Sequence, residues 1–255
     1  MAGETGLLTS RTIAILPLGA HEYHGPHLPL ETDTIIARAI AARLRTALPD
    51  TLDVIFLEAE PVGYSPEHLD RPGTKSLAFD EAVNRWLAIA EDLSSRGIRK
   101  LVLLNAHGGN SPLLTIVATE ARLRFAMLCV ATSWTRFGLP DGVITPKAKT
   151  IDIHGGDIET SVMLAIAPDK VDMSKAQDFP SAQSDFLERY RHLRAYGSHA
   201  FGWMMSDLNG DGAAGDAAAA NAEKGEKMIT HAVKGLVELV EDVDHFDLSD
   251  FFQET

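Results

Sequence analysis

The chain has 255 residues, 45% of them hydrophobic and 23% charged, an ordinary globular composition that is long enough for one large α/β domain. Its formal net charge is −13, and a surface of that sign repels nucleic-acid phosphates and anionic lipids, so neither nucleic acid nor a membrane is an expected partner. The amino terminus has no basic region, and the apolar stretch beside it is too short and too broken for a signal peptide or a membrane span. These features predict a soluble cytoplasmic protein.

Strand-like and helix-like segments alternate along the chain. Apolar runs of strand length occur at residues 12–18, 54–57, 100–104 and 126–133. They read as continuous hydrophobic segments, as expected of strands that are buried on both faces. Helical patterns cover residues 33–48, 79–96, 112–125, 157–165 and 213–241, the last of which begins with the alanine-rich stretch 213–222. This alternation predicts a single α/β domain over residues 1–255, with a mostly parallel β-sheet and helices on both faces.

The first strand runs into a loop that is dense in potential metal ligands. After Gly19 the loop carries His21, Glu22, His24, His27, Glu31 and Asp33. In open parallel sheets ligands bind outside the carboxyl ends of the strands, and imidazoles and carboxylates gathered there favour a divalent-metal site. Glu22 and His24 are two residues apart, so their side chains point the same way in an extended segment. Asp33 could instead cap the helix that follows, and the sequence leaves both interpretations open.

Two later segments each place a histidine before a pair of glycines. His107 follows the third strand, where it is either a site residue or a loop histidine with its hydrogen bonds satisfied. His154 precedes Gly155 and Gly156, which predicts a mobile group suited to proton transfer because the ordinary pKa of imidazole lies near neutrality. Glu159 falls in the first turn of a predicted helix, where a carboxylate also has a purely structural explanation in the helix dipole.

Taken together, these segments resemble the creatininase (creatinine amidohydrolase) family. The likeness is carried by ordered blocks at residues 16–34, 65–74, 105–110, 154–161 and 215–225. Any one block would be a weak signal, but several blocks in this order are a specific one. The resemblance implies an α/β fold that often assembles as hexamers, and therefore a homo-oligomer.

The resemblance also implies a dinuclear site for Zn²⁺, Mn²⁺ or a similar ion such as Fe²⁺. Carried onto this sequence, Glu22 would bind one ion and His24 the other. Asp33 would bridge both, and His107 would complete one coordination sphere. A hydroxide between the ions would be the nucleophile, and His154 would donate a proton to the leaving nitrogen.

The sequence departs from the family in two places. Creatininase has a glutamate where this chain has Gly109, so a ligand is missing, and we expect Glu159 to replace it as a metal ligand that also takes part in catalysis. Creatininase also has a tryptophan that covers the substrate shortly before the fourth block, whereas residues 148–153 contain no aromatic side chain. The expected substrate is therefore a small cyclic amide or formamide-like molecule rather than creatinine. Related members act on peptide bonds or cyclic ketones, and these remain alternatives.

Two other classes of protein are less consistent with the sequence. A non-catalytic protein with one structural metal would need a closed four-ligand site, whereas the loop glycines and the additional His154 favour an open one. A serine hydrolase of the α/β type would need a Gly-x-Ser-x-Gly segment, which the chain lacks. Trp203, Met204 and Met205 could line a subunit interface or the core, and the core is the expected position.

Overall fold

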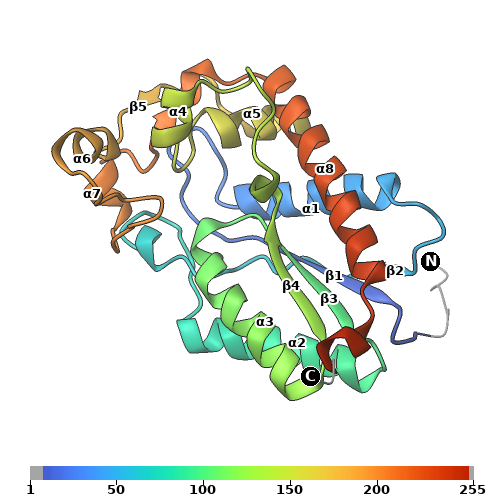
Figure 1. Ribbon diagram of the computed structural model, residues 1–255. Coiled ribbons are helices and arrows are strands. Elements are labelled where there is room, and N and C mark those ends of the chain that lie inside the picture. Colours follow the sequence, from blue (N-terminus) through green and yellow to red (C-terminus); the bar gives the residue numbers. More distant parts are fainter. Residues whose placement is uncertain (1–7, 253–255) are drawn as a thin grey trace.

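The structure is a computed structural model that describes residues 8–252. Four parallel strands form its central sheet (Figure 1). The strand order is β2-β1-β3-β4, with β1 at Ile13–Leu18, β2 at Val54–Phe56, β3 at Lys100–Asn105 and β4 at Leu128–Ser133. All four predicted strands are present, and every neighbouring pair is parallel. The expectation about the amino terminus lies outside the described residues. Within residues 8–252, no helix is long and apolar enough to span a membrane.

Helices cover both faces of this sheet, as predicted. The first face packs against α1 (Thr32–Ala47), α5 (Asp157–Ile166) and α8 (Ala222–His245), and the second against α2 (Phe79–Ser95) and α3 (Ser111–Phe125). Side chains of β1 alternate between the two cores, with Ile13 and Ile15 on the first face and Ala14 and Leu16 on the second. Because both faces are buried, the strands are continuously hydrophobic, which is the pattern that made them recognisable.

The chain leaves β1 and β3 toward opposite faces of the sheet. β1 leads to α1 on the first face, whereas the neighbouring β3 leads to α3 on the second. Connections that diverge in this way open a crevice at the carboxyl ends of the two strands, where open α/β sheets bind their ligands. The loops after β1 and β3 carry most of the predicted site residues.

A smaller layer lies beyond one end of the sheet (Figure 1). It contains the antiparallel pair of β5 (Asp178–Phe179) and β6 (Gly215–Asp216), and the short helices α4 (Pro146–Ile151), α6 (Gln183–Arg189) and α7 (Met205–Leu208).

The predicted helical start of segment 213–241 is wrong. Residues 213–222 contain β6 and the 3-10 turn Ala217–Ala219, and α8 begins only at Ala222. Gly215 has φ +146°, which a helix does not allow, and the Asp216 side chain accepts a hydrogen bond from the Ala219 backbone. Asn221 then caps α8 by accepting from the Lys224 N–H at 3.0 Å. Local side-chain hydrogen bonds therefore outweigh the helix propensity of the alanines.

Helix α8 lies directly on the backbone of α5. A Cβ atom at Gly225 of α8 would overlap the carbonyl oxygen of Ser161, which belongs to α5. The absence of a side chain at this one position lets the two helices approach, and α8 thereby supports α5, the helix that carries Glu159.

We expect Gly225→Ala to destabilise the protein, although alanine alone would favour a helix by about 1 kcal/mol. The overlap with Ser161 forces the two helices apart, at a cost of about 1–3 kcal/mol or more. Thermal unfolding measures the change, with the exposed Lys234→Ala in the same helix as a control expected within about 0.5 kcal/mol of the original protein. An unchanged melting temperature in Gly225→Ala would contradict the close approach.

Candidate metal centre

The loop after β1 brings three of the predicted ligands together. His24 Nδ1 donates to the backbone carbonyl of Glu22 at 2.9 Å, which turns Nε2 toward the carboxylates. His24 Nε2 lies 3.4 Å from Asp33 Oδ1 and 3.7 Å from Glu22 Oε1. Asp33 lies inside the first turn of α1, whose cap position is Glu31, and neither of its carboxylate oxygens has a hydrogen-bond partner, so the capping interpretation of this residue is wrong.

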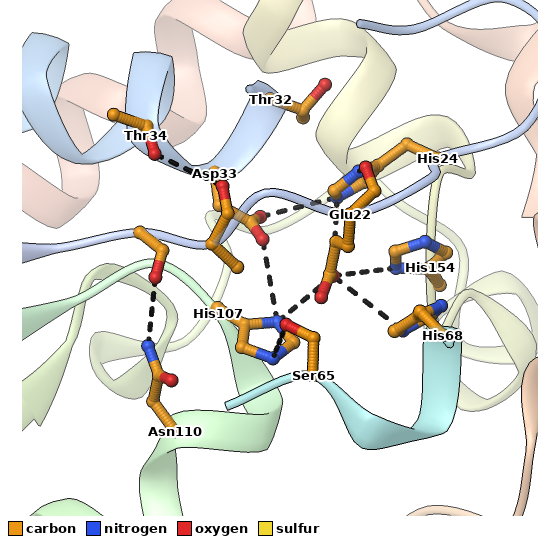
Figure 2. Close-up of polar contacts among 12 residues, drawn as sticks. Glu22, His24, Thr32, Asp33, Thr34, Ser65, His68, His107, Asn110 and His154 are labelled. Atoms are coloured by element: carbon orange, nitrogen blue, oxygen red, sulfur yellow. Dashed lines mark hydrogen bonds and ion pairs between the residues drawn. The ribbon is translucent and has the colours of Figure 1, made fainter. Parts of the chain in front are cut away.

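His107 reaches the same carboxylates from the end of β3 (Figure 2). Its Nδ1 lies 3.0 Å from Glu22 Oε1 and 3.5 Å from Asp33 Oδ2. On the other side of the ring, Nε2 lies 3.0 Å from the backbone carbonyl of Tyr64, to which it donates, and 3.1 Å from Ser65 Oγ. The imidazole is therefore fixed from behind, with its free nitrogen directed at the acidic pair.

Glu159 approaches the cluster from α5. Its Oε2 accepts the backbone N–H of Gly155 at 2.6 Å and lies 3.9 Å from His24 Nε2. The carboxylate therefore satisfies a backbone donor just before α5 and also faces the cluster, so its structural contact leaves it free to act there. His27 Nε2 lies 2.9 Å from Thr160 Oγ1, which ties the β1 loop to the same helix.

Several donor atoms of the cluster are left without hydrogen-bond partners, as expected of metal ligands. Both carboxylate oxygens of Glu22, both of Asp33 and Nε2 of His24 are buried without a hydrogen-bond partner. Buried polar atoms normally have partners, so five such atoms in one place indicate a missing ligand. Three residue groups each bring their donor atoms within 4.8 Å of one another, and the first two share Asp33: Glu22, Asp33 and His107; His24, Asp33 and Glu159; and Glu22, His24 and His154.

Charges within the cluster shift its pKa values. Burial lowers the pKa of His24, but the negative charges of Asp33 and Glu159 outweigh this and raise it to about 10. Burial opposes the charge on His107 as well, yet Glu22 raises its pKa to about 10. Burial raises the pKa of Glu22, but the adjacent His107 overcomes it and holds the pKa well below the usual value. Metal ions bind neutral imidazole, so an ion must displace these protons and its affinity rises with pH.

His154 is held in place rather than mobile, contrary to expectation. The side chain is buried, and Nε2 donates to the backbone carbonyl of Tyr23 at 2.7 Å. Its Nδ1 lies 3.7 Å from Glu22 Oε1, and its ring stacks on that of His24 with centroids 4.2 Å apart. Burial lowers the pKa of His154 to about 3, and the positive charge of His24 adds to the shift. The imidazole is therefore neutral, with an unprotonated Nδ1 that faces the cluster.

His68 belongs to the cluster and was missed by the sequence analysis. It is buried in a short turn after β2, and its Nε2 lies 3.7 Å from Glu22 Oε1 (Figure 2). Its ring lies against that of His154, with centroids 4.1 Å apart. The block at residues 65–74 pointed to this loop, but no spacing relates His68 to the other ligands. The family-like block at residues 65–74 was the one sequence feature that could have identified His68, but it does not indicate what the residue does.

The side-chain amide of Asn110 joins the loops that carry the cluster. Its Nδ2 donates to the carbonyl of Gly19 after β1 at 3.1 Å and to Asn105 Oδ1 at the end of β3 at 3.1 Å. Its Oδ1 accepts the backbone N–H of Tyr64 after β2 at 2.9 Å. One buried amide thus sets the relative positions of the loops after β1, β2 and β3.

The cluster opens into a cavity of about 660 Å³. Glu22, His107, His154 and Glu159 form part of its wall, and Trp203 and Met204 form part of the opposite, apolar side. The expectation of a core position holds for Met205, which is fully buried, and in part for Trp203, which packs against the small buried cluster around Met205 while also lining the cavity. It is wrong for Met204, which is exposed. The place of Trp203 and Met204 in the wall could not be read from a stretch with no helical or strand periodicity.

The chain is similar to known proteins over almost its whole length. The family model Creatininase, described as creatinine amidohydrolase, matches residues 4–240. The chain belongs to the creatininase family. A mycofactocin precursor peptide peptidase from Mycolicibacterium smegmatis is 32% identical, with 92% of this chain and 89% of the relative covered. The creatinine amidohydrolase of Pseudomonas putida is 28% identical, with 89% and 88% covered.

Solved creatininase structures have the same fold. A creatininase with manganese superimposes with a TM-score of 0.77 at 26% identity, covering 92% of each chain. Creatininase variants of a zinc–zinc type and in complex with creatine give TM-scores of 0.75 and 0.74. These likenesses confirm the predicted α/β fold class and the family, whose members are hydrolases.

Gly109, the position at which this member of the family departs from creatininase, has no room for a side chain. A Cβ atom there would overlap His107 Nε2, Glu67 Oε1 and the carbonyl of Tyr64. The carboxylate of Glu67, 3.7 Å from His107 Nε2, thus lies where a side chain on Gly109 would begin.

We expect Gly109→Ala to displace the His107 imidazole and to weaken Zn²⁺ binding by about 10- to 100-fold, the usual effect of disturbing the support of a ligand. Gly108→Ala is the matched control, because a Cβ atom at Gly108 has no neighbour within 4 Å. Titration of the metal-free protein with Zn²⁺ compares the two variants. Equal affinities would show that His107 does not depend on this space.

Proposed function

We propose that the protein is a dinuclear metal-dependent hydrolase of an amide or another C–N bond. One observation carries the proposal: two groups of donors, all buried except the half-buried Glu159, share Asp33, whose two oxygens are both without a hydrogen-bond partner. A bridging carboxylate needs two free oxygens, one for each ion. The donors also open into a cavity, which argues against a closed, purely structural metal site.

Five residues would hold the ions. Glu22 and His107 would bind one ion, His24 and Glu159 the other, and Asp33 both. Imidazole and carboxylate donors suit Zn²⁺ and Mn²⁺ and are compatible with Fe²⁺, and the solved relatives include manganese and zinc forms. Bound ions would polarise the substrate carbonyl and lower the pKa of a coordinated water.

His154 would move the proton in the reaction. Its Nε2 is committed to the Tyr23 carbonyl, which leaves the Nδ1 lone pair facing the cluster beside Glu22. Nδ1 can accept a proton from the attacking water and return it to the leaving nitrogen, the two halves of general acid–base catalysis. The sequence predicts His154 as a proton donor. Because burial keeps its pKa low, we propose that His154 first accepts the proton that it later donates.

The substrate would be a small amide, with a short peptide as the second candidate. The expectation from sequence is a cyclic amide or a formamide-like molecule. Two observations favour the peptide: the cavity of about 660 Å³ is larger than such molecules require, and the relative from Mycolicibacterium smegmatis is named as a peptidase. Assembly as a homo-oligomer such as a hexamer, and a cytoplasmic location, complete the proposal.

We expect Asp33→Asn to remove both ions, because the amide cannot bridge them and lacks the negative charge that holds two cations close together. Metal analysis after dialysis against excess Zn²⁺ or Mn²⁺ should give about two ions per chain for the original protein and close to none for the variant. Glu31→Gln, at the cap position of the same helix, is the control and should retain both ions. Full occupancy in Asp33→Asn would rule out the bridging role.

We expect His154→Ala to keep both ions and to lose turnover by about 10²- to 10⁴-fold, the usual contribution of general acid–base catalysis. Glu159→Ala should instead lose one ion, because its carboxylate completes the group around His24. Metal content and hydrolysis of an amide panel distinguish the two variants. If His154→Ala lost an ion while Glu159→Ala kept both, the two assignments would have to be exchanged.

A further inference from the structure

The cavity in front of the cluster has an apolar wall built from several segments. Its apolar and aromatic lining includes Tyr64 after β2, Ile153 before α5, and Tyr196, Phe201, Trp203 and Met204 from the segment before α7. Three of these side chains are substantially exposed, namely Tyr196, Phe201 and Met204. Exposed apolar groups gathered around a concave site are typical of surfaces that bind an apolar ligand.

Trp203 brings this wall up to the cluster. Its indole N–H donates to the carbonyl of Ala195 at 2.8 Å, which fixes the ring. The ring meets His68 edge to face, with centroids 6.1 Å apart, and His68 Nε2 lies 3.7 Å from Glu22. Only the His68 side chain therefore separates the apolar wall from the buried carboxylate of Glu22. A substrate whose reacting bond lies at the cluster would place its neighbouring group against this wall.

The charges of the cavity wall are all negative apart from its histidines. Glu67 and Asp207 line it in addition to the cluster carboxylates Glu22 and Glu159, and its described lining contains no lysine or arginine. Arg136 and Lys149 instead line an adjoining cavity of about 580 Å³, which shares Gly108, Pro112, Ile153, Glu159 and Tyr196 with the first. A phosphate or carboxylate in the first cavity would lose its hydration and meet negative charge without a basic partner.

We propose that the substrate carries a bulky apolar group next to the hydrolysed bond and that this group bears no phosphate or carboxylate. The inference rests on the proposed function, because it assigns the part of the substrate that adjoins the metal-held bond. Trp203 and Met204 determine the specificity for this group. A small polar amide would leave the apolar wall in contact with water and gain nothing from it.

Hydroxamates test the cavity without assuming which bond is hydrolysed, because their head group binds metal ions and their side chain varies. Four compounds serve as probes: acetohydroxamate, 3-phenylpropanohydroxamate, the 4-hydroxyphenyl form of the latter, and the phosphate ester of that phenol. Each would be titrated calorimetrically into the Zn²⁺-loaded protein. The phenyl compound should bind at least about tenfold more tightly than acetohydroxamate, since burial of a phenyl group is worth more than a factor of ten. The phosphate ester should bind at least about tenfold more weakly than the phenol.

Two variants assign the effect to the wall. Trp203→Ala should reduce the preference for the phenyl compound over acetohydroxamate, whereas Tyr190→Ala, an exposed aromatic side chain outside the cavity, should leave that preference unchanged. Met204→Lys adds a cation to the wall and should strengthen binding of the phosphate ester by at least about tenfold. The Met204→Lys variant tests the wall independently, so the experiment remains decisive if Trp203→Ala does not fold.

The outcomes separate this inference from the proposed function. If no hydroxamate binds and metal analysis finds no ions, the metal-dependent function itself is wrong. If all four bind, but with similar affinities or with the phosphate ester the tightest, the metal site stands and the apolar specificity is overturned. If Met204→Lys folds and leaves phosphate binding unchanged, the wall is not where this group lies.

Discussion

Two carboxylates, Glu22 and Asp33, are buried side by side with no hydrogen bond to their oxygens, and the end of the sheet is arranged around them. Isolated buried charges of this kind cost several kcal/mol each unless opposite charge compensates them. His24 and His107 supply part of that charge through their raised pKa values. Divalent ions would supply it more completely, because they bind the oxygens directly. The electrostatic cost of the acidic pair and its capacity for metal binding thus have one origin.

The topology of the sheet allows the donors that surround this acidic pair to converge at this position. The connections that follow β1 and β3 leave toward opposite faces, so their loops can converge on one point without colliding. Asn110 then fixes the loops to one another through hydrogen bonds to Gly19, Tyr64 and Asn105. A neutral amide serves here because it donates and accepts at once without adding charge to an already acidic site.

The sequence was sufficient where a residue's neighbours along the chain determine its surroundings. The strands were predictable because burial on both faces makes them continuously hydrophobic, and the Glu22–His24 pair because two-residue spacing directs both side chains the same way. It was insufficient where the decisive partner is distant. That Asp33 does not cap α1 is visible only in the structure, where Glu31 holds the cap position and the Asp33 oxygens have no hydrogen-bond partner. His68 joins the cluster through contacts that no spacing encodes. The alanines at 213–222 misled because Asp216 and Asn221 redirect the backbone by local hydrogen bonds.

The close contact between Gly225 and Ser161 has a consequence for the order in which the protein is completed. Helix α8 contributes no donor to the cluster, yet it packs on the helix that presents Glu159, and it follows every donor residue in the sequence. Contacts between segments so far apart in the sequence form late in folding. The full set of donors is therefore in place only after α8 has docked on α5, and metal ions then meet it in whatever mixture the surrounding compartment supplies.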